Sequence, residues 1–181
     1  MAPIYRLYIM QTSYNGSTYT KGTLVDVWTT FNVICADTPF KYYPEAKPLA
    51  TKDWVGQDGL EVYIPPQTRL KDYDWEMTFL YVGIRSNMRT NVTNFIKFLQ
   101  GRHPGVDNAA VGSRLAMYED YTQTGRKDIA FAGVEFDEWW DSPYEDSQSI
   151  ASFKVKFHLY DPVTNATPTT TQNVITGLTW T

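Results

Sequence analysis

The chain has 181 residues, of which 43% are hydrophobic, 20% are charged and 15% are aromatic, and its formal net charge is −4. This composition excludes a disordered protein, and the single cysteine, Cys35, excludes a disulfide scaffold. The sequence also lacks the basic stripe typical of proteins that read bases or coat phosphates. The length favours one domain over residues 1–181, and the aromatic content favours strands.

Strand patterns fill the first part of the chain. Residues 4–10 predict a strand that ends at a Gly-containing turn. Residues 23–35 carry apolar side chains on both faces, which predicts a central strand. Three prolines make residues 37–52 an extended loop that cannot be an inner strand. A hairpin is expected around Asp58-Gly59, because Asp-Gly favours a tight turn.

The middle of the chain changes its periodicity. Residues 74–82 alternate and predict an inner strand. A helix is predicted over about 91–100, because apolar residues recur there at helical spacing: Val92, Phe95, Ile96 and Leu99. Asn91 or Thr90 is available as the N-cap, and Gly101 is placed to end the helix.

The second half returns to strands. Arg114–Tyr118 and Lys127–Phe136 are joined by a polar, Gly-containing connection and predict a hairpin. Residues 152–160 alternate and predict a half-buried antiparallel strand, and residues 173–180 predict a last edge strand. The predicted fold is mainly β: an antiparallel β-sandwich or open barrel with one flanking α-helix.

A search for catalytic sets returns nothing. His103 and His158 do not share a zinc-type spacing with Cys35, so no metal site is expected. The sequence has no nucleophile elbow, and its glycines do not form a phosphate-cradling loop. The sequence therefore predicts a protein that is not an enzyme and that needs no cofactor.

One acidic cluster stands out between two predicted strands, in an extended loop over residues 137–148. Its acidic residues are Glu135, Asp137, Glu138, Asp141, Glu145 and Asp146, and its aromatic residues are Trp139, Trp140 and Tyr144. A solvated loop explains this composition, while a calcium site, a sugar-binding face and a glycosidase pair are alternatives. Adjacent strand residues point to opposite faces, so one tryptophan of the pair can be core while the other makes contact.

Several stretches follow one another in a recognisable order. They are Trp54-Val-Gly-Gln-Asp-Gly-Leu60, Tyr73-Asp-Trp-Glu-Met-Thr-Phe79, the helix 91–100, a hairpin through Gly125-Arg126, and Ala151-Ser-Phe-Lys-Val-Lys-Phe-His-Leu-Tyr-Asp-Pro162. This order resembles the amino-terminal domain of phage distal tail proteins over roughly residues 50–162. The sequence lacks the second, carbohydrate-module-like domain that many members of the family carry, which leaves tail-tube and tube-capping subunits as close competitors.

The resemblance implies a function without an active site. Such proteins are tail-tube-like β-domains that assemble into a six-fold ring around a channel, in the virion tail, after synthesis in the host cytoplasm. The implied partners are further copies of the chain and other tail proteins. DNA would only pass through the lumen, without sequence-specific binding, and no membrane contact is expected.

Aromatic residues in the predicted loops are the candidate subunit contacts. They are Tyr42, Tyr43, Trp139, Trp140 and Tyr144. Exposed aromatic residues are enriched among the side chains that dominate protein interfaces, which favours this hypothesis. The alternative is a carbohydrate-binding β-sandwich module in which the same rings stack on sugars.

Overall fold

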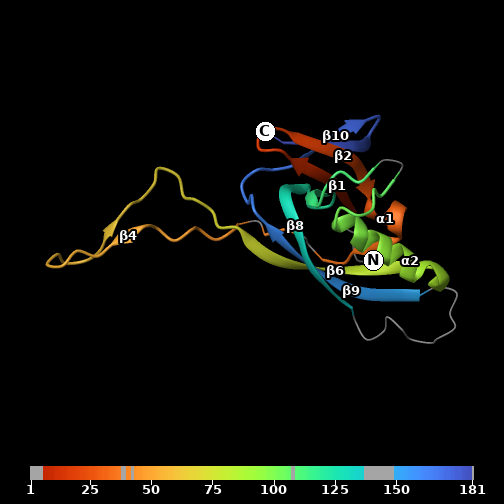
Figure 1. Cartoon of the computed structure of the whole chain (residues 1–181), viewed down its shortest axis with the longest axis horizontal. Coiled ribbons are helices and arrows are strands. Elements are labelled where there is room, and N and C mark those ends of the chain that lie inside the picture. The colour runs from red at the N-terminus through yellow and green to blue at the C-terminus, as the bar shows by residue number, and fades with distance from the viewer. Residues whose placement is uncertain (1–5, 38–39, 42, 107–108, 137–148, 181) are drawn as a thin grey trace.

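The computed structural model describes residues 6–37, 40–41, 43–106, 109–136 and 149–180. The mainly β fold that the sequence predicts is confirmed, with 49% strand and 13% helix. A large antiparallel sheet forms the body of the protein, and a long hairpin projects away from it (Figure 1).

Seven strands form the large sheet. They are β1 (Leu7–Tyr14), β2 (Tyr19–Asp26), β3 (Val33–Cys35), β6 (Tyr73–Gly83), β7 (Arg114–Glu119), β8 (Thr124–Phe136) and β9 (Ser149–Leu159). Their order is β2-β1-β7-β8-β9-β6-β3, and every neighbouring pair is antiparallel. The predicted hairpin of β7 with β8 is confirmed, and so is the inner position of β6, between β9 and β3.

The pairing of β6 with β9 explains why these two segments form strands. Apolar residues alternate along both, and the register places Phe79 opposite Phe153, with ring centroids 5.8 Å apart. Such aromatic cross-strand pairs stabilise a sheet beyond the area they bury. The intervening residues of β9, such as Lys154 and Lys156, are exposed, as expected for a half-buried strand.

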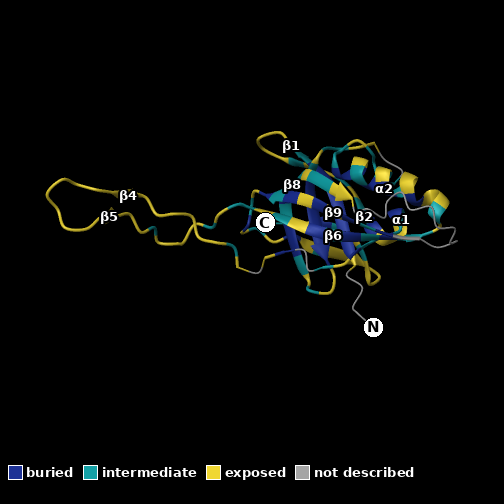
Figure 2. Ribbon diagram, turned by 90° about the horizontal axis from the view of Figure 1, so that it is seen from below, coloured by how far each residue is buried: buried dark blue, intermediate teal, exposed yellow. Residues whose placement is uncertain are grey.

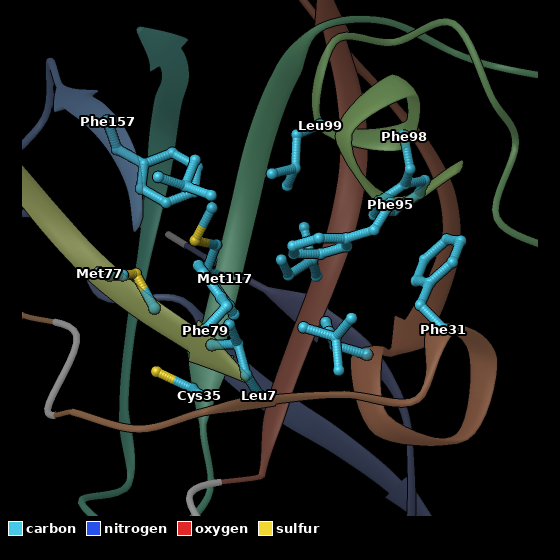
Figure 3. Close-up of a cluster of buried hydrophobic side chains, with 14 of the residues drawn as sticks. Leu7, Phe31, Cys35, Met77, Phe79, Phe95, Phe98, Leu99, Met117 and Phe157 are labelled. Atoms are coloured by element: carbon cyan, nitrogen blue, oxygen red, sulfur yellow. The ribbon is translucent and has the colours of Figure 1, made fainter. Parts of the chain in front are cut away.

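Helix α2 (Arg85–Leu99) packs its apolar side against one face of the sheet. Figure 3 shows Phe95, Phe98 and Leu99 of the helix among side chains of the strands. The helix begins six residues before the predicted range, and its N-cap is Ile84 without a side-chain hydrogen bond, so the assignment of Asn91 or Thr90 as N-cap is wrong. The predicted end is correct, because Gly101 follows the helix with a φ of 70°.

Helix α1 (Val27–Phe31) overturns the prediction of one central strand over residues 23–35. Asp26 ends β2 and caps the helix, because its Oδ1 accepts the backbone N–H groups of Trp28 at 3.0 Å and Thr29 at 3.4 Å. Asn32 then takes a left-handed conformation, with a φ of 56°, and starts β3. Trp28 lies on the outer side of this turn and is 37% exposed.

A second, smaller apolar cluster lies over the β1–β7 side of the sheet. It contains Tyr8, Met10, Ala116, Tyr118 and Leu178. Leu178 belongs to β11 (Val174–Thr179), which pairs with β10 (Thr167–Thr171) in a separate two-stranded sheet. The predicted last strand therefore exists, and it covers the large sheet as part of a ribbon instead of extending its edge.

Candidate assembly surface

The projecting hairpin is called the arm here and comprises residues 43–71. It contains the short strands β4 (Thr51–Lys52) and β5 (Glu61–Val62), which pair with each other and with no other described strand. Figures 1 and 2 show the arm leaving the sheet and continuing away from the body. The hairpin predicted around Asp58-Gly59 is confirmed, and part of the predicted loop 37–52 forms its first limb.

Backbone hydrogen bonds join the two limbs of the arm near its base. The N–H of Lys47 donates to the carbonyl of Arg69 over 2.7 Å, and the N–H of Lys71 donates to the carbonyl of Glu45 over 2.7 Å. These bonds hold the limbs side by side before the paired strands begin. The arm is therefore an ordered hairpin, not a loose loop.

Side chains fix the tip of the arm. Trp54 Nε1 donates to Glu61 Oε2 over 2.6 Å, across the turn, and Lys52 Nζ lies 3.5 Å from the centre of the Trp54 ring. Gly56 and Gly59 adopt φ angles of 92° and 86°, which only glycine reaches without strain. A defined turn thus carries the residues between them at the far end of the arm.

Apolar side chains along the arm remain in water. None of them belongs to either hydrophobic cluster of the body. Val55 at the tip is as exposed as in an extended peptide, with a relative exposure of 109%. The large exposed apolar residues of the arm are Tyr43, Leu49, Trp54, Val55, Leu60, Val62, Tyr63 and Ile64. Exposed apolar surface that gathers on one element favours an interaction site in soluble proteins.

His158 marks the place where the arm joins the sheet. Its Nδ1 lies 2.6 Å from Asp74 Oδ1, and its Nε2 lies 3.1 Å from Asp72 Oδ2. The ring of Tyr160 packs beside the imidazole, with centroids 4.3 Å apart. Burial raises the pKa of the phenol of the neighbouring Tyr73, whose hydroxyl oxygen accepts the backbone N–H of Lys41 over 3.3 Å. The arm is thereby anchored at the start of β6.

The polar face of β6, β8 and β9 carries charges that pair with one another. Lys154 Nζ lies 3.3 Å from Glu76 Oε1, and Lys156 Nζ lies 3.3 Å from Glu135 Oε2. Such exposed pairs contribute little to stability. They leave a hydrated surface in which neither sign of charge dominates.

Tyr43 is the one predicted contact residue that falls in the described part of the chain. It lies at the base of the arm and is 90% exposed. The other candidates lie outside the described residues and stay predictions: Tyr42, Trp139, Trp140 and Tyr144. Of the acidic cluster, only Glu135 falls in the described part of the chain, because residues 137–148 lie outside it.

His103 and Cys35 are both held by local structure. His103 Nδ1 accepts the N–H of Gly105 over 3.0 Å, and its ring packs against Phe31. Burial raises the pKa of the Cys35 thiol far above its ordinary value. Within the described ranges, no three His, Cys, Asp or Glu side chains are grouped so as to hold a metal ion.

The sequence placed the first limb of the arm, within the loop 37–52, among the candidate contacts, but it did not predict that residues 53–64 would be exposed at a projecting tip. Its residues have the composition of ordinary strands, and only tertiary structure shows that nothing in the described body covers them. A signal was present in Pro48, Pro65 and Pro66, which flank the tip and lack the N–H group that pairing in a larger sheet requires.

Neither a protein-family model nor a curated protein matches this chain. In the part of the chain that the structure describes, no helix is both long and apolar enough to cross a membrane. The arm, with its exposed apolar residues, is the feature from which a function can be inferred.

Proposed function

We propose that this chain is a non-enzymatic structural subunit of a phage-type tail, which assembles with further copies into a ring or tube that conducts DNA. The observation that carries the proposal is the arm, an ordered hairpin that holds its apolar side chains outside the body. The resemblance of residues 50–162 to distal tail proteins supports the same class of function.

Burial of apolar surface favours association of the arm with a partner. Removal of apolar surface from water contributes roughly 25 cal/mol per Å². Val55, Tyr63 and Ile64 each expose more than half of their surface. A contact between the arm of one copy and the body of the next removes this apolar surface from water and is stabilised by that burial. Because the contact joins two different surfaces, it is head-to-tail. Head-to-tail contacts generate closed rings or open filaments.

The polar face of β6, β8 and β9 suits the lumen of such an assembly. Its lysines are paired with carboxylates, as in the contact of Lys156 with Glu135. A surface without a net excess of positive charge does not retain the phosphate backbone, because affinity for DNA grows with the number of phosphates that basic residues neutralise. Passage of DNA without binding follows from this balance.

Light scattering over a range of concentrations, with electron microscopy of the same samples, tests the proposal. We expect ring or tube particles from the intact chain and their loss when Val55, Tyr63 and Ile64 are each replaced by serine. Val163→Ser is the control, because Val163 is about as exposed as Tyr63 but lies outside the arm. A chain that stays monomeric at high concentration and forms no particles contradicts the proposal.

Exposed aromatic rings on the arm favour one alternative, a carbohydrate-binding module. Trp54 and Tyr63 are both exposed, and aromatic rings stack on sugar faces. Titration with soluble polysaccharides distinguishes the two functions: a sugar-binding protein binds a glycan as a monomer and loses that binding in Trp54→Ala. A structural subunit assembles without glycan.

A further inference from the structure

An open pocket of about 640 Å³ lies at the start of β8, at the opposite end of that strand from Glu135. The β7–β8 turn forms one wall and residues 165–168 form the other. The two walls are joined by backbone pairing of Arg126 with Asn165, and by the N–H of Ala166, which donates to the carbonyl of Gly125 over 3.1 Å.

Arg126 in this pocket is a buried cation that forms no ion pair with any residue the structure describes. Its side chain and backbone together are only 8% exposed. Nη1 donates to the carbonyl of Gly125 over 3.1 Å and to Oδ1 of Asn165, both uncharged acceptors. Nε is buried and has no hydrogen-bond partner. Among the described residues, no carboxylate lies within ion-pair distance of this guanidinium.

Other basic side chains of the same region form ion pairs with carboxylates. Arg114 Nη1 lies 2.7 Å from Asp128 Oδ1, and Lys127 Nζ lies 3.0 Å from Asp128 Oδ2 and 3.1 Å from Asp161 Oδ2. Removal of a charge from water is unfavourable unless an opposite charge accompanies it. The unpaired Arg126 is therefore a site that a carboxylate from outside the chain's own body would complete, since arginine binds carboxylates strongly.

The arm carries the matching charge. Its tip, residues 51–64, has three acidic residues, Asp53, Asp58 and Glu61, and one basic residue, Lys52. Glu61 accepts from Trp54, whereas Asp58 bonds to no other described residue and lies in the turn between Gly56 and Gly59. The arm of the same molecule leads away from its body, so its tip is available to another molecule (Figure 1).

We propose that the pocket at Arg126 receives the tip of the arm of a second copy of the chain, with Asp58 as the counter-ion of Arg126. The inference rests on the proposed function and deepens it, because it names the two surfaces that meet. Arm and pocket are different surfaces of one chain, so each copy donates one arm and accepts another, as a ring or tube requires. The apolar side chains around Asp58 are then removed from water by the same contact.

Charge reversal tests the pairing. We expect Asp58→Lys to weaken self-association, measured by sedimentation, by about tenfold or more, because two like charges then meet in the pocket. Asp53→Lys is the matched control, since it makes the same change of net charge on the same arm and is expected to leave association close to that of the intact chain. Circular dichroism verifies that each variant is folded.

Mixing of two variants gives the sharper result. Asp58→Lys supplies a lysine arm with an intact pocket, and Arg126→Glu supplies an intact arm with a glutamate pocket. Neither is expected to assemble alone, whereas the equimolar mixture has complementary contacts throughout and assembles with alternating copies. If Arg126→Glu does not fold, Arg126→Gln is used instead. We expect Arg126→Gln to associate as weakly as Asp58→Lys does. Adding Asp58→Lys to Arg126→Gln is then expected to cause no further loss of association.

The possible outcomes separate this inference from the proposed function. Assembly of Asp58→Lys at the strength of the intact chain overturns the pairing and leaves the structural role standing. The pairing is also overturned if acetate, titrated against the monomeric protein, perturbs the pocket while charge reversal leaves assembly unchanged. Arg126 then binds a free anion instead of Asp58. An intact chain that never associates overturns both.

Discussion

Gln11 joins β1 to the last turn of α2 by a hydrogen bond of 2.7 Å from its Nε2 to the carbonyl oxygen of Phe98. The same nitrogen donates to the carbonyl of His103 over 2.7 Å, and the Oε1 accepts the N–H of Val111 over 3.1 Å. Gln11 is buried, so one side chain satisfies the end of the helix and two positions of the loop that follows it.

Replacement of this side chain tests its importance for the helix. Gln11→Leu keeps the volume but leaves the partner groups of Phe98, His103 and Val111 buried without hydrogen bonds. We expect the free energy of unfolding to fall by about 2–3 kcal/mol, measured by urea denaturation. Gln57→Leu, on the exposed arm, is the control and is expected to change it by less than about 0.5 kcal/mol.

Gly125 is required by the close approach of the backbone at Ala166. A Cβ at this position would lie 2.1 Å from the carbonyl oxygen of Ala166, which is backbone and cannot turn away. We expect Gly125→Ala to lower the melting temperature, with a loss of stability on the order of 2 kcal/mol or more. Gly133→Ala, on the same strand, is the control, because its Cβ would meet no atom within 4 Å. Equal melting temperatures for the two variants would contradict this account.

Asp161 makes the stability of the body depend on acidity. Partial burial by itself would raise the pKa of its carboxyl, but hydrogen bonds from Thr164, Lys127 and Val163 outweigh burial and lower the pKa to about 2. A carboxyl with a lowered pKa stabilises the fold above its unfolded value, near 4, and that stability is lost as the pH falls toward 2. We expect unfolding free energies to decline across this window.

Asp161→Asn isolates the contribution of this carboxyl. Because the amide does not titrate, the variant is expected to be less stable at pH 7 and to lose less stability between pH 4 and pH 2, by on the order of 1 kcal/mol. Denaturation curves at several pH values measure the difference. An identical pH dependence in both proteins would show that other groups govern acid unfolding.

Phe95 is the aromatic centre of the contact between α2 and the sheet. Its ring centroid lies 5.1 Å from that of Phe79 and 5.5 Å from that of Phe31, and the residue is fully buried (Figure 3). We expect Phe95→Ala to cost about 3–5 kcal/mol in unfolding free energy, because it leaves a cavity. Trp28→Ala, at an exposed ring, is expected to cost far less, and calorimetry compares the two.

Cys35 provides a probe of unfolding. Burial raises the pKa of its thiol, so the reactive thiolate is scarce in the folded protein. We expect a thiol reagent to label the native chain slowly and to label it fully, once per chain, after addition of denaturant. Fast labelling of the folded chain would indicate that β3 opens locally.

Periodicity in the sequence was sufficient to predict those helices and strands that keep one side buried and the other in water along their whole length. The alternation in β9 and the helical spacing of α2 reflect one buried side and one wet side, and both elements were predicted. Residues 23–35 misled the prediction because an apolar run on both faces fits a strand and a buried turn of helix equally well. The capping residues, Asp26 and Asn32, were the available signal.

The candidate site could be predicted only in part. Asp58-Gly59 indicated a hairpin, but exposure of the arm depends on what the rest of the chain leaves uncovered. The lack of an ion pair between Arg126 and the other described residues likewise depends on distances between groups far apart in the sequence, which no local pattern contains. Sequence patterns indicate which side of a helix or strand is buried. A binding surface depends instead on which apolar side chains and charges the folded chain leaves without partners of its own.

The order of strands also dictates when the protein can fold during its synthesis. Tyr8 of β1 pairs with Tyr118 of β7, and Tyr73 of β6 pairs with Leu159 of β9. The arm and the β1–β2 hairpin close from nearby residues, but β9 lies between β6 and β8 and is translated after both. A ribosome that stops before β9 releases a chain with two unpaired sheet edges, which are templates for aggregation. β9 is the last strand of the large sheet to be made, so it completes that sheet and protects the strands made before it.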